Sequence, residues 1–242
     1  MRDLNKELLS GYKLFKREND IIQWGIDRNI IGNNAQATFE GQQEKTRQEW
    51  QEWKENHTKD DIGDIFVTLV MGAAFKSTTI TGCVSAFLQE YGLGSPEDYL
   101  ENVTYNGHLL EENYLDDNLN KYLSTNNYLT FFEKVSLVID SLNVNALKYG
   151  WTLEECIEVA WDDIKDRKGK MVHGMFIKQH DLDSLSEHGV IVVEESGKVY
   201  FQGEGRNISF NSYRIITDIF NKLSLEIGYF EDMKYLRTVG RI

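Results

Sequence analysis

Two pairs of acidic residues place the strongest constraint on what this 242-residue chain can fold into. Glu49 and Glu52 form one pair and Asp61 and Asp64 the other, each with the i, i+3 spacing that puts two side chains on one face of a helix. Two such helices packed together could direct four carboxylates at one point. Like charges that close repel each other unless a cation neutralises them, and Mg²⁺ prefers oxygen ligands. The spacing therefore predicts two packed helices, a divalent-metal site and phosphate chemistry with metal-activated water.

Each of these acidic residues also has a purely structural interpretation. Glu49 and Glu52 could belong to a solvated helix face, where glutamate is common. Thr58 and Asp61 have the spacing of a capping box, and acidic residues in a first turn suit the helix dipole. Asp64 is harder to explain in this way, because it lies inside an otherwise apolar segment where an unpaired charge is costly to bury. The spacing alone leaves both interpretations open.

The period of the apolar residues predicts a mainly α chain, a helical bundle with a small α+β appendage at its C-terminal end. Thr58 has the position of an N-cap, and the apolar helix after it is expected to run to about Tyr91. Other helices are expected over 4–24, 36–55, 128–148, 152–169 and 211–227, and a β-hairpin over 189–194 and 198–202. We expect an all-α domain at 1–181, with an insertion of two short helices at 92–127, and the appendage at 182–242.

The composition of the chain disfavours nucleic acid and membrane as partners and indicates the compartment of the protein. The net charge of −13 disfavours nucleic-acid binding, because phosphate contacts need clustered Lys and Arg. Cys83 and Cys156 are the only cysteines, which favours a reducing compartment. No apolar stretch reaches the roughly 20 residues of a membrane helix, so we expect a cytoplasmic protein without a membrane partner. The P-loop, HExxH and GxSxG patterns do not occur in the sequence.

A basic run and one tryptophan are candidates for substrate binding. Lys165, Arg167 and Lys168 follow an expected helix, where they could either complement the helix dipole or clamp phosphate oxygens. Trp24 precedes the polar stretch that contains Asn29, and its ring could either stack on a nucleotide base or pack in the core. For both sets the structural alternative stays open.

Three segments resemble the MazG-like all-α nucleoside triphosphate pyrophosphohydrolases, in particular the single-domain versions of bacteriophages. Glu49-Trp-Gln-Glu52 matches the ExxE motif of that family and Asp61-Ile-Gly-Asp64 its E/DxxD motif, and the run 164–172 (IKDRKGKMV) is similar to the basic end of its last helix. The likeness covers about 20–75 and 128–178. It implies the all-α pyrophosphatase fold and a homo-oligomer, in the host cytoplasm if the chain is phage-encoded.

The resemblance also implies an activity, the Mg²⁺-dependent hydrolysis of (deoxy)nucleoside triphosphates to the monophosphate and pyrophosphate, with Mn²⁺ as a substitute metal. A metal-bound water would attack the α-phosphorus, with Glu52 as general base. We expect the remaining roles to follow the same scheme. The metal ligands are Glu49, Glu52, Asp61 and Asp64, the pyrophosphate contacts are Lys165, Arg167 and Lys168, and the base contacts are Trp24 and Asn29.

Two functions of other classes remain as alternatives. One is a non-catalytic protein that binds a nucleotide or alarmone, and the other is a helical protein–protein adaptor. Neither needs four acidic side chains close together, so the separation of the acids is the feature that distinguishes them.

Overall fold

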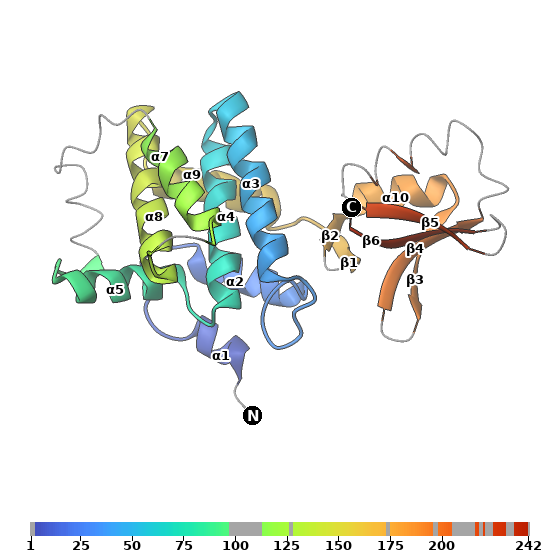
Figure 1. Ribbon diagram of the computed structural model, residues 1–242, viewed down its shortest axis with the longest axis horizontal. Helices are drawn as coiled ribbons and strands as arrows, with labels where there is room; N and C mark the ends of the chain where they lie inside the picture. Colours follow the sequence, from blue (N-terminus) through green and yellow to red (C-terminus); the bar gives the residue numbers. More distant parts are fainter. Residues whose placement is uncertain are drawn as a thin grey trace. The chain divides into compact units, whose positions relative to one another are not determined.

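The computed structural model divides into two compact units (Figure 1), Met1–Asp27 with Ile31–Asp166 and Arg28–Ile30 with Arg167–Ile242. The residues that the structure describes are 3–96, 113–125, 128–172, 175–195, 198–204, 216–217, 220, 225–230 and 235–241. The chain is mainly helical, as the sequence predicted, and it also has two small antiparallel sheets, of which the sequence predicted one hairpin.

The described part of the first unit is built of helices, most of which begin at a threonine. Its elements are α1 (Leu4–Leu9), α2 (Glu18–Asp27), α3 (Phe39–Asn56), α4 (Lys59–Phe75), α5 (Ile80–Tyr91), α7 (Tyr114–Leu123), α8 (Phe131–Lys148) and α9 (Leu153–Ile164). In five of them the N-cap hydroxyl accepts a hydrogen bond from a backbone N–H of the first turn; these caps are Thr38, Thr58, Thr79, Thr130 and Thr152. Each such cap contributes about 1 kcal/mol, so local chemistry sets where these helices start.

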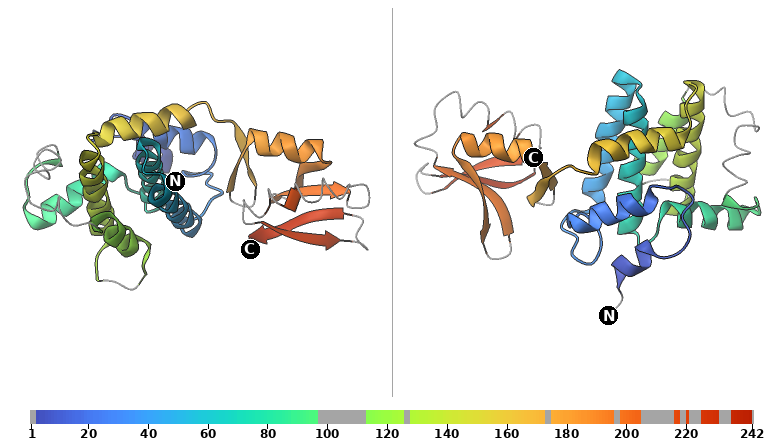
Figure 2. Two further views of the ribbon diagram at one scale, coloured as in Figure 1. Left: turned by 90° about the horizontal axis from the view of Figure 1, so that it is seen from above. Right: turned by 180° about the vertical axis from the view of Figure 1, so that it is seen from behind.

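Helix α4 is the centre of this unit. Its residues from Asp61 to Ala74 are buried with the exception of Asp64, and it packs against α3 and α9, with further contacts to α2, α5 and α8. Helices α3 and α4 lie side by side in every view (Figures 1 and 2). Helices α4 and α9 approach each other closely at Gly63, where an added Cβ would collide with the carbonyl oxygen of Cys156 in α9. The glycine between the two aspartates is therefore needed for helix packing.

The helix expected from Thr58 to Tyr91 is broken. Helix α4 ends at Phe75, Ser77 adopts a left-handed conformation with φ of 57°, and Thr79 caps a new helix, α5, which is bent by 76° from α4. Apolar periodicity continues across this break, and for that reason the sequence predicted one helix. Within the described ranges, no single helix is both long and apolar enough to cross a membrane; α4 and α5 pass that test only when taken together.

Helix α7 is part of the core, although 92–127 was expected to be an insertion. Its residues Leu115, Leu119 and Tyr122 are buried, and the helix packs on α8 and also contacts α3. The Tyr122 hydroxyl lies against Gly72 of α4. Residues 97–112 of this range, in which a second short helix was also expected, lie outside the described residues.

The second unit begins before the expected boundary at 181. Helix α9 ends at Ile164 instead of 169, and the chain forms a hairpin of β1 (Gly169–Val172) and β2 (Met175–Lys178), followed by α10 (Gln179–Glu187). These elements share one core with the next strand: Val172, Ile177, Leu182, Leu185, Val190, Ile216 and Phe220. Because the hairpin belongs to that core, the division falls after Asp166.

The larger sheet is antiparallel with strand order β3-β4-β6-β5. Strands β3 (Val190–Glu195) and β4 (Lys198–Glu204) pair as the expected hairpin, and β6 (Tyr235–Arg241) lies between β4 and β5 (Leu225–Phe230). The helix predicted over 211–227 falls largely outside the described residues, and its last three positions belong to β5.

A buried carboxyl group links α2 to α5. Glu18 is fully buried; its Oε1 accepts from the backbone N–H of Thr81 at 3.1 Å and its Oε2 from the Thr81 hydroxyl at 2.6 Å. Burial disfavours the charged form, so the pKa of Glu18 is raised above its ordinary value although these two bonds oppose the shift.

Replacing Gly63 with alanine should destabilise the helical unit by about 1–3 kcal/mol, because the new methyl group overpacks the α4–α9 contact. The melting temperature, followed by far-UV circular dichroism, should fall for Gly63→Ala and stay unchanged for Gln51→Ala, a control at an exposed position of α3. A Gly63→Ala protein as stable as the control would contradict the proposed close approach.

The stability contributed by Glu18 should depend on pH. The unfolded chain titrates near the ordinary value of 4.5 and the folded chain above it, so the folded state holds the proton more tightly and stability is lost as pH rises through the raised pKa. Glutamine does not ionise, so Glu18→Gln removes this loss of stability at high pH. The free energy of unfolding of the variant minus that of the parent, measured in urea, should therefore grow from pH 4.5 upward. A difference independent of pH would exclude the buried carboxyl as its source.

Candidate functional site

The two acidic pairs lie on adjacent antiparallel helices. Helices α3 and α4 pack against each other and are joined by only two residues, His57 and Thr58, so the chain reverses direction between them (Figure 1). Glu52 and Asp61 are therefore the members of each pair nearer to the turn, and Glu49 and Asp64 lie about one helical turn farther from it. The packed pair of helices predicted from the spacing is present.

The four carboxylates have different surroundings. Glu49 is 8% exposed and its Oε1 lies 3.1 Å from Lys45 Nζ, whereas Glu52 is exposed and Asp64 half-buried. Asp61, also 8% exposed, accepts with Oδ2 from the backbone N–H and the hydroxyl of Thr58 at 2.8 and 2.6 Å. The structural interpretation of Asp61 as half of a capping box is thus confirmed.

These residues suit Mg²⁺ in donor chemistry, but their arrangement is not that of a formed metal site. Among the residues that the structure describes, which include all four acids, no three Asp, Glu, His or Cys side chains are placed to hold one ion. Glu49 pairs with Lys45 and Asp61 with Thr58, and Glu52 and Asp64 have interactions of their own. The metal site therefore stays a prediction.

The basic residues expected to clamp pyrophosphate are divided between the two units. Lys165 closes α9 and its Nζ lies 2.6 Å from Asp162 Oδ1; this hydrogen bond raises the pKa of Lys165. Arg167 and Lys168 belong to the second unit, where their backbone carbonyl oxygens accept hydrogen bonds from Arg28 and from Gln179. The common clamp of these three side chains also stays a prediction.

Trp24 has a packing role within the first unit. Its ring is 8% exposed and its Nε1 donates to the carbonyl oxygen of Ile164 at 2.8 Å, which ties α2 to the end of α9. Core packing, the alternative to base stacking, thus describes this side chain. Asn29 belongs to the second unit, with a left-handed φ of 55°.

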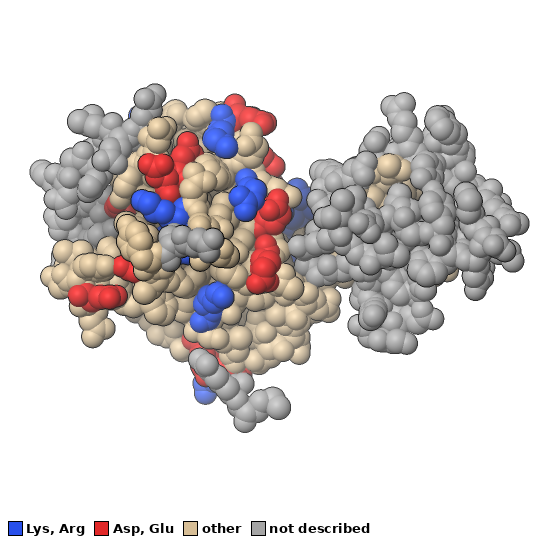
Figure 3. Space-filling model, in the orientation of Figure 1, with Lys and Arg blue, Asp and Glu red and all other residues tan. Residues whose placement is uncertain are grey.

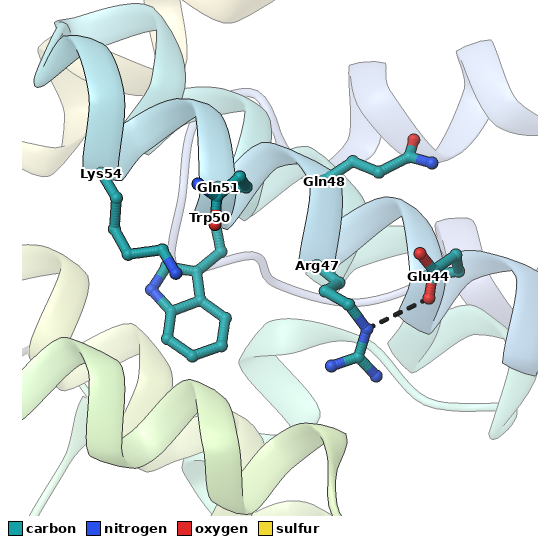
Figure 4. A pocket seen from close by; sticks show the side chains of 6 residues that line it. All are labelled: Glu44, Arg47, Gln48, Trp50, Gln51 and Lys54. Atoms are coloured by element: carbon teal, nitrogen blue, oxygen red, sulfur yellow. Dashed lines mark hydrogen bonds and ion pairs between the residues drawn. The ribbon is translucent and has the colours of Figure 1, made fainter. Parts of the chain in front are cut away.

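A pocket of about 400 Å³ opens on α3 (Figure 4). Its lining residues all come from that helix: Glu44, Arg47, Gln48, Trp50, Gln51 and Lys54. Lys54 Nζ lies 4.4 Å from the centroid of the Trp50 ring, and Arg47 pairs with Glu44. Glu49 is two residues from Arg47, about 200° around the helix, so the pocket opens away from Glu49.

Four aromatic rings meet where two turns of the bundle come together, a feature that the sequence did not reveal. They are Trp53 and His57, at the end of α3, and Tyr149 and Trp151, between α8 and α9. The contacts between the two turns span about ninety positions of the sequence, so no sequence pattern indicates the cluster. We call these four residues the aromatic cluster.

Charge is mixed on the surface of the helical unit. On the face drawn in Figure 3, acidic and basic side chains are interspersed over its described residues. Several pair with each other, for example Arg17 with Asp20 and Glu158, which raises the pKa of the Arg17 guanidinium. Most of these pairs are exposed, and such pairs contribute about 0–1 kcal/mol each to stability.

Comparisons with protein-family models, with curated proteins and with solved structures return no match for this chain. The resemblance to the MazG-like family therefore rests on the sequence motifs alone, and the residues themselves carry the case for a function.

Proposed function

We propose that this chain hydrolyses (deoxy)nucleoside triphosphates to the monophosphate and pyrophosphate in a Mg²⁺-dependent reaction. One observation carries the proposal: the ExxE and DxxD pairs lie on packed antiparallel helices, at matched distances from a two-residue turn.

Small rearrangements would make the four acids available. In the Lys45–Glu49 pair the lysine side chain is 57% exposed and the glutamate side chain 11% exposed, so the lysine can move into solvent while a bound cation takes its place beside the glutamate. Asp61 makes its capping bonds with Oδ2 alone, which leaves Oδ1 for another partner. Glu49, Glu52, Asp61 and Asp64 would hold the ion, which when bound supplies neutralisation of phosphate oxygens and an acidified water.

The protein's own side chains would perform the proton and charge steps. The oxygen of water attacks the α-phosphorus, the bond to the bridging oxygen of the β-phosphate breaks, and pyrophosphate leaves. Glu52 is the exposed member of the acidic set and would accept the proton of the attacking water. Lys165, which belongs to the same unit as the acids, would neutralise the charge that develops on pyrophosphate.

Pyrophosphate release, measured with the eight common nucleoside and deoxynucleoside triphosphates, should require Mg²⁺. Glu52→Gln and Asp64→Asn should each reduce turnover by about 100-fold or more, because one removes the proton acceptor and the other a ligand. Glu55→Gln, an exposed acid on the same helix, is the matched control and should retain activity. Variants as active as this control would refute the assignment. Binding of Mg²⁺–nucleotide without any release of pyrophosphate would instead identify a non-catalytic nucleotide-binding protein.

Lys165→Ala should raise KM for triphosphates more than for diphosphates, because the lost cation contacts the departing pyrophosphate. Asp162→Asn provides the control, since it breaks the same 2.6 Å ion pair but keeps the lysine. Steady-state kinetics should show the increase in KM only for Lys165→Ala. An equal effect of both variants would mean that the ion pair, and not the cation, is what matters.

A further inference from the structure

The aromatic cluster exposes ring surface at one end of the helical bundle. Tyr149 is 45% exposed, His57 is exposed and Trp151 is half-buried, while Trp53 beneath them is 4% exposed. The Trp53 ring centroid lies 4.9 Å from that of His57 and 5.5 Å from that of Tyr149, and Tyr149 stacks on Trp151 at 5.0 Å with an interplanar angle of 21°. A buried indole thus supports three rings that solvent can reach.

The backbone under this cluster is conformationally costly. His57 has φ of 54° and ψ of 51°, the left-handed conformation that usually selects glycine after a helix. A non-glycine residue in this region costs on the order of 1 kcal/mol and often marks a functional position. Here the conformation ends α3 and holds the imidazole against Trp53 and Tyr149, with the ring centroids of His57 and Tyr149 6.0 Å apart.

An ion pair borders the rings. Lys59 Nζ lies 5.8 Å from the centroid of the Trp151 ring and 3.5 Å from Glu155 Oε2. The charges of the pair balance each other, and the ammonium group can still donate a hydrogen bond to an anion that is attached to a neutral planar ligand on the rings. A nucleobase carrying phosphate has that chemistry, because every base has an aromatic face that stacks on such rings.

We propose that the aromatic cluster is the base-binding site of the nucleotide, with the base stacked on Tyr149, Trp151 and His57. This inference rests on the proposed function, in that the nucleotide is the substrate whose phosphates reach the acidic pairs. His57 follows Glu52 by five residues, about 7.5 Å along the helix axis, which is comparable to the length of a nucleoside. The cluster takes the role that the sequence assigned to Trp24, whose ring is enclosed in the core.

The test measures binding of deoxynucleoside monophosphates without turnover. Proton NMR of the base protons should show an upfield shift on addition of the protein, the signature of stacking on aromatic rings. Tyr149→Leu keeps an apolar side chain but removes the ring, and should raise Kd by about 5-fold or more. Tyr149→Phe should restore binding, and Tyr128→Ala, at a tyrosine that is 95% exposed elsewhere, should leave it unchanged. Ribose 5-phosphate, which lacks a base, should bind equally to all four proteins.

The outcomes separate this proposal from the proposed function. If Tyr149→Leu binds the monophosphates as the parent does, or if the parent gives no upfield shift, the base site is wrong even where pyrophosphate is released. If stacking is lost in that variant but no pyrophosphate is released by the parent, the base site stands and hydrolysis fails. A variant that changes its oligomeric state in sedimentation and leaves Kd unchanged would assign the rings to an interface between copies of the chain, which overturns the proposal.

Discussion

Helix α4 has apolar side chains around most of its circumference, and the other helices of the unit pack around it and bury it. Helices α3 and α9 pack on two of its sides, while α2, α5 and α8 complete the enclosure. Gly63 lets the α9 backbone approach, and Gly72 makes room for the Tyr122 hydroxyl. Because Asp61 and Asp64 lie on this helix, the packing that buries α4 also decides where their carboxylates can point.

The sequence predicted best those features that depend on local chemistry. Thr58 is the predicted N-cap of α4, and the apolar period placed α3, α8 and the start of α9 within a few residues. The short β-prone runs likewise placed the β3–β4 hairpin. Asp61 could serve both as a capping residue and as a metal ligand, because a carboxylate has two oxygens and the cap uses only one of them.

Features that depend on long-range contacts were not predictable from the sequence. The break between α4 and α5 leaves the apolar period intact, and α7 joins the core only through α8 and α3. The sequence leaves Trp24 a candidate for stacking as well as for core packing, and its bond to the Ile164 carbonyl oxygen identifies the packing role. The aromatic cluster depends on two distant turns meeting, and on a histidine that adopts a backbone conformation typical of glycine.

The most direct test of the account is the anomalous scattering of Mn²⁺ in crystals of the full chain grown with that ion. The account predicts a strong peak between α3 and α4, within coordination distance of Glu49, Glu52, Asp61 and Asp64, and a Glu49 carboxylate that has left Lys45. Crystals with Mn²⁺ present, no peak between these helices and the Lys45–Glu49 pair intact would contradict it.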